Sequence, residues 1–226
     1  GSFTVALLTA LHAFKGDTAS KKNLAEEAFY VEAECAKQPT GKQDPFLGAF
    51  GGLTCLEIDR SGDVIVSPLK LANDLQRELA SSLLIFFTGI QRESFDILSE
   101  QVSATRSGNA ATLESLHETK KIGYQIRDAL TVGDLDQFGH LLDQHWQNKK
   151  KRSTNMTNAD IDRWYQMGRD AGALGGKILG AGGGGFLMFY CPTEYRRKVR
   201  QLMANEGLRE MRFCIDYEGA TILLNI

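Results

Sequence analysis

Four consecutive glycines, Gly182–Gly185, lie between two short apolar segments rather than in a polar linker. Glycine readily adopts positive φ and lets the backbone approach another group closely. A glycine-rich bend between two strand-like runs therefore suits an anion held by successive N–H groups. The bend predicts a phosphate-binding loop. The alternative is a tightly packed strand connection without a ligand, and an isolated glycine run favours that alternative.

A second segment, GKQDPF at residues 41–46, is followed by GAFGG at residues 48–52. Here Asp44 stands at a turn that enters a helix, where a carboxylate can be held in one orientation. We expect Lys42 to keep Asp44 ionised, as a general base for a hydroxyl proton needs to be. Alternatively, Asp44 caps a helix whose first turn contains Pro45.

Together, and in this order, the two segments resemble the GHMP small-molecule kinases. GAGGGG at residues 180–185 looks like the third motif of that family. GKQD followed by AFGG looks like the segment that carries the catalytic aspartate in its sugar-kinase branch. Within that branch, the stretches 87–92, 97–101 and 171–177 are similar to D-glycero-D-manno-heptose 7-phosphate kinases, and the likeness covers essentially the whole chain.

The resemblance implies an ATP-dependent kinase that uses Mg²⁺. It would transfer the γ-phosphoryl group to the anomeric 1-hydroxyl of a heptose 7-phosphate and give the 1,7-bisphosphate. Asp44 would be the catalytic base. Another sugar 1-kinase, such as a fucokinase, shares several of these features and is the alternative within the family.

The resemblance also implies binding residues. Ser2 lies at the edge of the magnesium and phosphate loop, or else it is the N-cap of the first helix. The predicted phosphate-binding positions are Ser2, Gly180, Ala181, Gly182, Gly183 and Gly184. The predicted substrate-binding positions are Lys42, Gln43, Arg92, Lys149, Lys150 and Lys177. Of these, Lys177 has an equally good interpretation as a solvated residue at the entrance of a strand, and basic runs at helix ends are usually solvated.

One departure from the family pattern concerns the first residues. Gly1–Leu8 resembles only the tail of the second motif, the loop that wraps the nucleotide phosphates in these kinases. Gly1-Ser2 fits that pattern, but it fits an expression scar as well. The expectation is a fragment that oligomerises or depends on a separate N-terminal piece. The rival interpretation is a sugar-phosphate binding module that has lost catalysis.

Composition argues against several other classes of protein. The chain has 226 residues, of which 42% are hydrophobic and 24% charged, and its formal net charge is -2. No global field attracts nucleic acid or an anionic membrane. The longest apolar runs are far shorter than the ~20 residues that cross a bilayer, so we expect a cytoplasmic location. The four cysteines lack the spacing of a zinc or redox site, which predicts small buried hydrophobes at Cys35, Cys55, Cys191 and Cys214.

The hydrophobic periodicity predicts the order of elements. Helices are expected at residues 3–14, 24–35, 92–104, 109–131, 134–150, 158–173 and 193–205. Strands are expected at 54–58, 64–66, 83–87, 177–179, 186–190, 210–216 and 220–225. This order favours an α+β fold with helices packed on a mostly antiparallel sheet. By resemblance, residues 1–80 are the second part of a GHMP N-terminal domain and residues 81–226 are a ferredoxin-like C-terminal domain.

Overall fold

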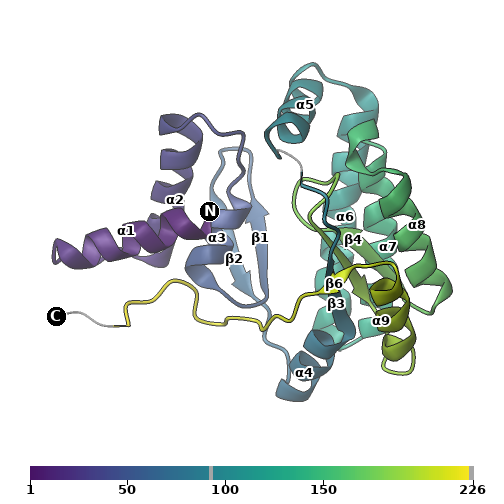
Figure 1. Ribbon diagram of the computed structural model, residues 1–226. Coiled ribbons are helices and arrows are strands. Elements are labelled where there is room, and N and C mark those ends of the chain that lie inside the picture. The colour runs from purple at the N-terminus through teal and green to yellow at the C-terminus, as the bar shows by residue number, and fades with distance from the viewer. Residues whose placement is uncertain (92–93, 224–226) are drawn as a thin grey trace. The chain divides into compact units, whose positions relative to one another are not determined.

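The computed structural model describes residues 1–91 and 94–223 and divides into two compact units, whose elements are drawn in Figure 1. Unit 1 comprises Gly1–Lys70 and the C-terminal segment from Cys214 onward, and unit 2 comprises Leu71–Phe213. Both units combine helices with antiparallel strands, which confirms the α+β class. The domain limits 1–80 and 81–226 stay a prediction.

Unit 1 begins with three helices: α1 (Ser2–Phe14), α2 (Lys21–Tyr30) and α3 (Gln43–Phe50). A π-helical turn, Val31–Cys35, extends α2. The hydroxyl of Ser20 accepts a hydrogen bond from the backbone N–H of Asn23 at 3.1 Å and so caps the start of α2. The two helices expected from periodicity in this region are therefore confirmed.

The hairpin of unit 1 joins β1 (Thr54–Ile58) to β2 (Val64–Pro68) in antiparallel register, with Ile58 opposite Val64. Its turn is ordered by Asp59, whose carboxylate accepts from the N–H groups of Ser61 and Asp63 at 2.8 and 2.9 Å. This hairpin confirms the expectation from sequence, with a second strand two residues longer.

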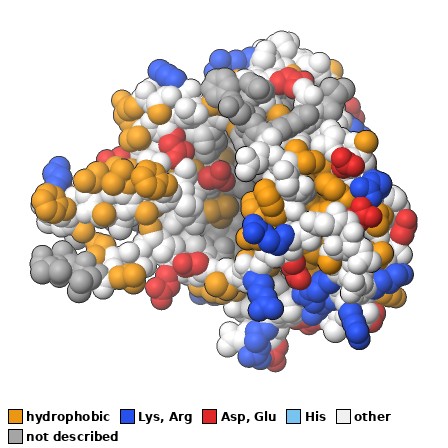
Figure 2. Space-filling view, viewed as in Figure 1, with side chains coloured by type: hydrophobic (Ala, Val, Ile, Leu, Met, Phe, Trp, Pro, Cys, Tyr) orange, Lys and Arg blue, Asp and Glu red, His pale blue; other side chains and the backbone are white. Residues whose placement is uncertain are grey.

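The core of unit 1 is small, and one face of α1 stays outside it. Val5, Ala25 and Phe46 are fully buried and bring the three helices together. The opposite face of α1 carries a stripe of apolar side chains that are 47 to 89% exposed, and the orange side chains along α1 in Figure 2 show how they gather. We call this set the α1 stripe: Phe3, Leu7, Leu11 and Phe14.

The C-terminal segment corrects an expectation. Strands were expected at 210–216 and 220–225, but only β6 (Arg209–Glu210) is a strand, and residues 211–223 are irregular. The N–H of Met211 still donates to the carbonyl of Ile85 at 2.8 Å, but the later backbone groups bond elsewhere. Asp216 accepts from the N–H of Gly52 at 2.6 Å, and Ala220 donates to the carbonyl of Gly48 at 2.9 Å. Residues 224 and 225 lie outside the described part of the chain.

Unit 2 is built on a four-stranded antiparallel sheet in the order β4-β5-β3-β6. Its three longer strands are β3 (Leu83–Phe87), β4 (Gly175–Ile178) and β5 (Phe186–Tyr190). Leu83 pairs with Tyr190, and Ile178 pairs with Leu187. The strands expected at 83–87 and 186–190 are confirmed, and β4 covers most of the strand expected at 177–179.

Six helices of unit 2 complete the described elements. They are α4 (Asn73–Ser82), α5 (Ser94–Arg106), α6 (Ala110–Val132), α7 (Leu135–Lys150), α8 (Ala159–Asp170) and α9 (Arg196–Asn205). A 3₁₀ turn, Thr154–Met156, precedes α8. The expectations at 92–104, 109–131, 134–150, 158–173 and 193–205 correspond to α5 to α9, apart from residues 92 and 93, which lie outside the described part. Only α4 was not expected.

Glycines let α7 lie against the sheet. A Cβ at Gly175 of β4 would collide with the backbone of Gly139 and would lie 2.7 Å from the amide nitrogen of Asp143, both in α7. Around this contact, Trp146, Phe86 and Phe189 are buried in the main core of unit 2. The close approach fixes which residues of α7 face β4.

The expectation for the cysteines is partly wrong. Cys191 is buried and Cys55 half-buried, but Cys35 and Cys214 are exposed, because one ends the π-helical turn and the other lies in the irregular C-terminal segment. None of the helices in residues 1–91 and 94–223 is long and apolar enough to span a bilayer. The cytoplasmic location stays a prediction.

Candidate functional site

Residues 179–185, which we call the glycine loop, connect β4 to β5 in unit 2. Gly180, Gly182, Gly183 and Gly185 have φ angles of 75°, 118°, 73° and 85°. L-residues with a Cβ rarely adopt this left-handed region, so the conformation explains why the loop is made of glycine.

Part of the glycine loop is a packed connection, as the alternative interpretation held. The N–H of Gly183 donates to the carbonyl of Met156 at 2.8 Å, and the N–H of Gly185 donates to the carbonyl of Ile90 at 2.9 Å. A Cβ at Gly182 would lie 2.5 Å from the sulfur of Met156, and one at Gly184 would lie 2.6 Å from the carbonyl oxygen of Ile90. The predicted phosphate contact at Gly183 therefore lacks a free N–H.

The other N–H groups of the glycine loop have no hydrogen-bond partner within residues 1–91 and 94–223. They belong to Gly180, Ala181, Gly182 and Gly184. These four residues line a pocket of about 370 Å³, together with Phe87, Ile90 and Gln91. Unpartnered N–H groups beside a cavity suit an anion. The loop thus combines close packing on one side with free donors on the other.

Thr88 braces the end of this loop, a role that the sequence did not single out. Its N–H and its hydroxyl both donate to the carbonyl of Gly185 at 2.9 Å. Its hydroxyl oxygen also accepts from the N–H of Ile90 at 3.3 Å. Because Thr88 is buried and follows β3 directly, it fixes the loop to the sheet.

A basic cluster lies beside the glycine loop, formed by Lys149, Arg152 and Lys177 together with His145. Lys149 is only 7% exposed, and its ammonium donates to the carbonyl of Gly180. No carboxylate lies within ion-pairing distance of the three cations in the part of the chain that the structure describes. Within the described residues, the charge of the cluster therefore has no compensating carboxylate.

Burial and mutual repulsion disfavour the charged forms in this cluster. The pKa of Lys149 is lowered to about 7, mainly by burial and in part by the charges of Lys177 and Arg152. Burial also lowers the pKa of Lys177, with a contribution from Arg152. For His145, burial and the neighbouring cations lower the pKa to about 3, so this imidazole is neutral at physiological pH.

Lys150, another predicted cation, is not part of this cluster. The ammonium of Lys150 lies 3.3 Å from a carboxylate oxygen of Asp162 and 5.9 Å from the centre of the Trp146 ring. It already has an anionic partner. Arg92 lies outside the described residues, so its predicted contact with the substrate stays a prediction.

In unit 1, the starts of α1 and α3 lie together. A Cβ at Gly1 would be 2.7 Å from the Cβ of Asp44, and a Cβ at Gly48 would be 3.2 Å from the Cα of Ser2. Asp44 and Ser2 are both exposed, and each lies in the first turn of its helix. The structure thus brings the predicted base and the predicted magnesium-loop serine into one neighbourhood.

Neither capping alternative is observed. Lys42 is the N-cap of α3 and Gly1 that of α1, and neither helix start has a side-chain cap hydrogen bond. Asp44 is instead the second residue of α3, where the positive end of the helix dipole stabilises a carboxylate. Gln43, the first residue of α3, is also exposed.

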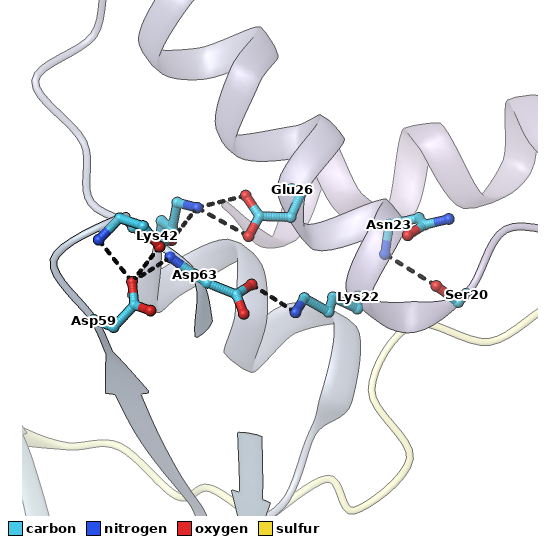
Figure 3. Close-up of polar contacts among 9 residues, drawn as sticks. Ser20, Lys22, Asn23, Glu26, Lys42, Asp59 and Asp63 are labelled. Atoms are coloured by element: carbon cyan, nitrogen blue, oxygen red, sulfur yellow. Dashed lines mark hydrogen bonds and ion pairs between the residues drawn. The ribbon is translucent and has the colours of Figure 1, made fainter. Parts of the chain in front are cut away.

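Lys42 does not pair with Asp44, which corrects the expectation from sequence. Figure 3 shows its ammonium bound to both carboxylate oxygens of Glu26, at 2.9 and 2.7 Å. It also donates to the carbonyl of Gly62 at 2.6 Å and lies 5.3 Å from the centre of the Phe29 ring. Lys42 therefore ties α2, α3 and the hairpin turn together, and its predicted role in substrate binding stays a prediction.

The two groups of residues lie in different units: Ser2 and Asp44 in unit 1, and the glycine loop and the basic cluster in unit 2. That they serve one reaction stays a prediction. Chemically, the first group offers an exposed carboxylate and a hydroxyl, and the second offers free N–H donors beside cations. The first group can accept a proton, and the second can bind phosphate.

Comparisons with known proteins agree with this chemistry. Residues 126–207 match the family described as GHMP kinases C terminal. The chain is 32% identical over 185 residues, 81% of its length, to a D-glycero-alpha-D-manno-heptose 7-phosphate kinase of Campylobacter jejuni, of which it covers 54%. It is 27% identical over 80% of its length to an L-fucokinase/L-fucose-1-P guanylyltransferase of Bacteroides fragilis, of which it covers 19%.

Among solved structures, the chain resembles a D-glycero-D-manno-heptose 1-phosphate kinase from Bacteroides thetaiotaomicron. The TM-score is 0.74 at 26% identity, over 96% of this chain and 60% of the other. The GHMP kinase-like fold expected from the sequence is therefore confirmed. The chain spans about half the length of the heptose 7-phosphate kinase that it matches.

Proposed function

The chain carries the C-terminal region of the GHMP kinases, and from this premise we propose that it is part of an ATP-dependent sugar kinase. The kinase transfers the γ-phosphoryl group of ATP to the anomeric 1-hydroxyl of D-glycero-D-manno-heptose 7-phosphate and gives the 1,7-bisphosphate. The observation that carries the proposal is the glycine loop, which has four N–H groups without a partner among the described residues, beside a pocket of about 370 Å³.

In the proposed reaction, Asp44 accepts the proton of the sugar's 1-hydroxyl. The hydroxyl oxygen attacks the γ-phosphorus in line with the bond that breaks. The bond between that phosphorus and the bridging oxygen breaks, and ADP leaves with the electron pair. The supporting feature is the exposed position of Asp44 in the first turn of α3, where a carboxylate is favoured as an anion.

The glycine loop binds phosphate in this proposal. N–H groups of Gly180, Ala181, Gly182 and Gly184 point charge-compensating dipoles at the phosphate oxygens without any reorganisation during the reaction. Gly183 supports this arrangement through its own bond to Met156. The remaining predicted binding residues keep their proposed roles toward the substrates: Lys42, Gln43, Arg92, Lys149, Lys150 and Lys177.

Mg²⁺ is implied by the family. Within residues 1–91 and 94–223, no group of three or more His, Cys, Asp or Glu side chains could hold a metal ion alone. Mg²⁺ bound with ATP usually takes only one or two protein oxygens and completes its shell with phosphate oxygens and water. The exposed Ser2 hydroxyl, which lies in the same neighbourhood as the Asp44 carboxylate, fits that requirement. When bound, the ion neutralises negative charge on the transferred phosphate.

A second candidate is another sugar 1-kinase. The observation in its favour is the fucokinase relative, which matches 80% of this chain. A sugar-phosphate binding module without catalysis is a third candidate. The second candidate would prefer a different acceptor sugar, and the third would bind sugar phosphate without releasing ADP.

The test is a coupled assay of ADP release by the whole protein with heptose 7-phosphate, unphosphorylated heptose, fucose and mannose. We expect the highest kcat/KM with heptose 7-phosphate, and a fall in kcat of about 10²- to 10⁴-fold in Asp44→Asn. A preference for fucose would favour the second candidate. An absence of acceptor-dependent ADP release would reject a kinase.

A further inference from the structure

We infer that Lys149, Arg152 and Lys177 together form a binding site for one phosphoryl group beside the glycine loop. The inference rests on the proposed function for the identity of the ligand, a phosphate carried by a substrate of the kinase. It adds Arg152 to the site, and it leaves Lys150 out because Asp162 already holds that ammonium.

The spacing of these residues places them on one side of α7. His145, Lys149 and Arg152 follow one another at intervals of four and three residues, so they lie along one face of α7 and its continuation. Alternate residues of a strand point to the same side. Lys177 therefore shares the side of β4 on which Gly175 touches α7.

The glycine loop lies next to the same residues. The hydrogen bond from Lys149 to the carbonyl of Gly180 ties the basic cluster to the first residue of the loop that has a free N–H. An anion held by the free N–H groups would therefore have a nearly buried cation beside it. Backbone donors and cations in one place are the usual composition of a phosphate site.

Arg152 is held in place from α6. Its Nε donates to the hydroxyl of Ser115 at 2.9 Å, and its Nη2 donates to the hydroxyl of Thr119. Asn148 locks the same two residues, since its side-chain amide donates to the Ser115 carbonyl at 2.8 Å and to the Thr119 hydroxyl at 3.0 Å. Among the described residues nothing bonds to Nη1 of Arg152, so this nitrogen is left for an anion.

The energetics also favour an anionic ligand. Burial of a charge without a partner is costly, and three buried or half-buried cations without a carboxylate repel one another. The ring nitrogen Nδ1 of His145 is buried in the same cluster and has no hydrogen-bond partner in the described part of the chain. A phosphoryl dianion would compensate the charges of the three cations and would accept hydrogen bonds from the cluster.

The direct test measures binding of inorganic phosphate to the purified chain by isothermal titration at constant ionic strength. The variants Lys149→Met and Lys177→Met remove one charge each and keep a side chain of similar length. We expect at least tenfold weaker binding in each. Lys151→Met is the matched control, because Lys151 is the adjacent exposed cation, and it should bind like the wild type.

If the heats of titration are too small to measure, the melting temperatures of the four proteins with and without phosphate provide the test. Without phosphate, both methionine variants should melt at or above the wild-type temperature, because they relieve repulsion. Phosphate should raise the melting temperature of the wild type and of Lys151→Met only. Equal stabilisation of all four proteins by phosphate, or none in the wild type, would overturn the inference.

Steady-state kinetics of the whole protein identify the source of the phosphate. If the acceptor supplies it, Lys149→Met raises the KM for heptose 7-phosphate at least tenfold and leaves that for unphosphorylated heptose unchanged. If ATP supplies it, the KM for ATP rises with both acceptors. Because phosphate binding to the chain needs no turnover, a protein that binds phosphate here but releases no ADP would reject the kinase and keep the site.

Discussion

The ammonium of Lys149 donates a hydrogen bond to the carbonyl of Gly180, and this bond joins the end of α7 to the start of the glycine loop. Lys149 is 7% exposed, so the bond lies almost entirely out of water. Among the described residues, the amine is then held beside backbone N–H groups without a partner rather than beside a carboxylate. If the loop binds an anion as proposed, the protonation of Lys149 and the occupancy of the loop are interdependent.

We predict that phosphate affinity falls as the pH rises above 7. Burial lowers the pKa of Lys149 to about 7, and an anion would favour its charged form. Methyl phosphate is a suitable probe, since the second pKa of a phosphomonoester lies near 6 and the ligand stays a dianion above pH 7. Between pH 7.5 and 9.5, the Kd should rise toward tenfold for each pH unit.

Three groups face Lys149 and belong in the interpretation of this profile: Lys177 from β4, and Arg152 and His145 from α7 and its continuation. Because the pKa of His145 is about 3, it stays neutral over this range. The Lys149→Met variant should show a much flatter profile. A wild-type Kd that stays constant from pH 7.5 to 9.5 would contradict the coupling.

The ligand-free chain should show the opposite trend in stability. Between pH 7 and 10.5 the unfolded state holds the proton of Lys149 and the folded state does not, so the unfolded state binds more protons. The free energy of unfolding therefore rises with pH in this window. Chemical denaturation of the wild type and of Lys149→Met at pH 7.5 and 9.5 measures the difference.

Gly184→Ala should damage the loop more than Gly180→Ala. A Cβ at Gly184 would lie 2.6 Å from the carbonyl oxygen of Ile90, whereas a Cβ at Gly180 would meet nothing within 4 Å. The first change forces the backbone apart at a cost of about 1–3 kcal/mol. The second adds only the strain of positive φ, about 1–2 kcal/mol.

Phosphate titration separates the two loop variants more clearly than stability does. Gly184→Ala should lose at least tenfold in affinity for phosphate, because it displaces the backbone of residues that line the pocket. Gly180→Ala keeps their positions and should lose less. If both variants bind phosphate as the wild type does, the glycine loop is only a packed connection.

Lys42→Met should lower the free energy of unfolding of the chain by about 1.5–3 kcal/mol, since hydrogen bonds to charged groups contribute that much. Lys42 and Glu26 are 19% and 33% exposed in their side chains, so water replaces the lost bonds poorly. Urea denaturation measures the change. Lys22→Met, which breaks the exposed pair with Asp63 at 2.7 Å, is the control and should lower the free energy of unfolding by less than Lys42→Met does.

The same variant tests the assignment of Lys42 to the substrate site. If Lys42→Met leaves stability unchanged but raises the KM for the sugar in the whole protein, its bonds to Glu26 and Gly62 are incidental. Substrate binding would then be its main role.

The α1 stripe should make the chain self-associate. Phe3 and Phe14 are 79% and 89% exposed, and together with Leu7 and Leu11 they form a continuous apolar face of one helix. We expect concentration-dependent oligomers in light scattering, and we expect Leu7→Ser with Phe14→Ser to reduce them. Val132→Ser removes a single exposed apolar side chain in unit 2 and should have no effect. A monodisperse wild-type monomer would contradict this prediction.

Much of the fold follows from the sequence because local patterns determine it. Phe3, Leu7, Leu11 and Phe14 recur at helical spacing, and α1 forms over these residues, although the same side chains face outward. Periodicity thus predicts an element but not which elements cover it. One strand was expected over residues 210–216, yet the last described backbone bond to β3 is the one from Met211 to Ile85. Beyond it, Asp216 and Ala220 bond to other residues of unit 1.

The site was less predictable from sequence. The glycine loop was expected because its signal is local, and the strands on both sides of it formed as predicted. The adjacency of Lys42 and Asp44 suggested an ion pair, but Glu26, 16 residues earlier, receives the ammonium. Arg152 was not among the predicted binding positions, and its position depends on Ser115, which is 37 residues away in α6.

The identity of the product tests the central claim most directly. The whole protein, incubated with ATP, Mg²⁺ and D-glycero-D-manno-heptose 7-phosphate, should yield ADP and a sugar bisphosphate in equal amounts. Its ³¹P NMR spectrum should show the new phosphate coupled to the anomeric proton. ADP without a phosphorylated sugar, or a phosphate on any other hydroxyl, would contradict the account.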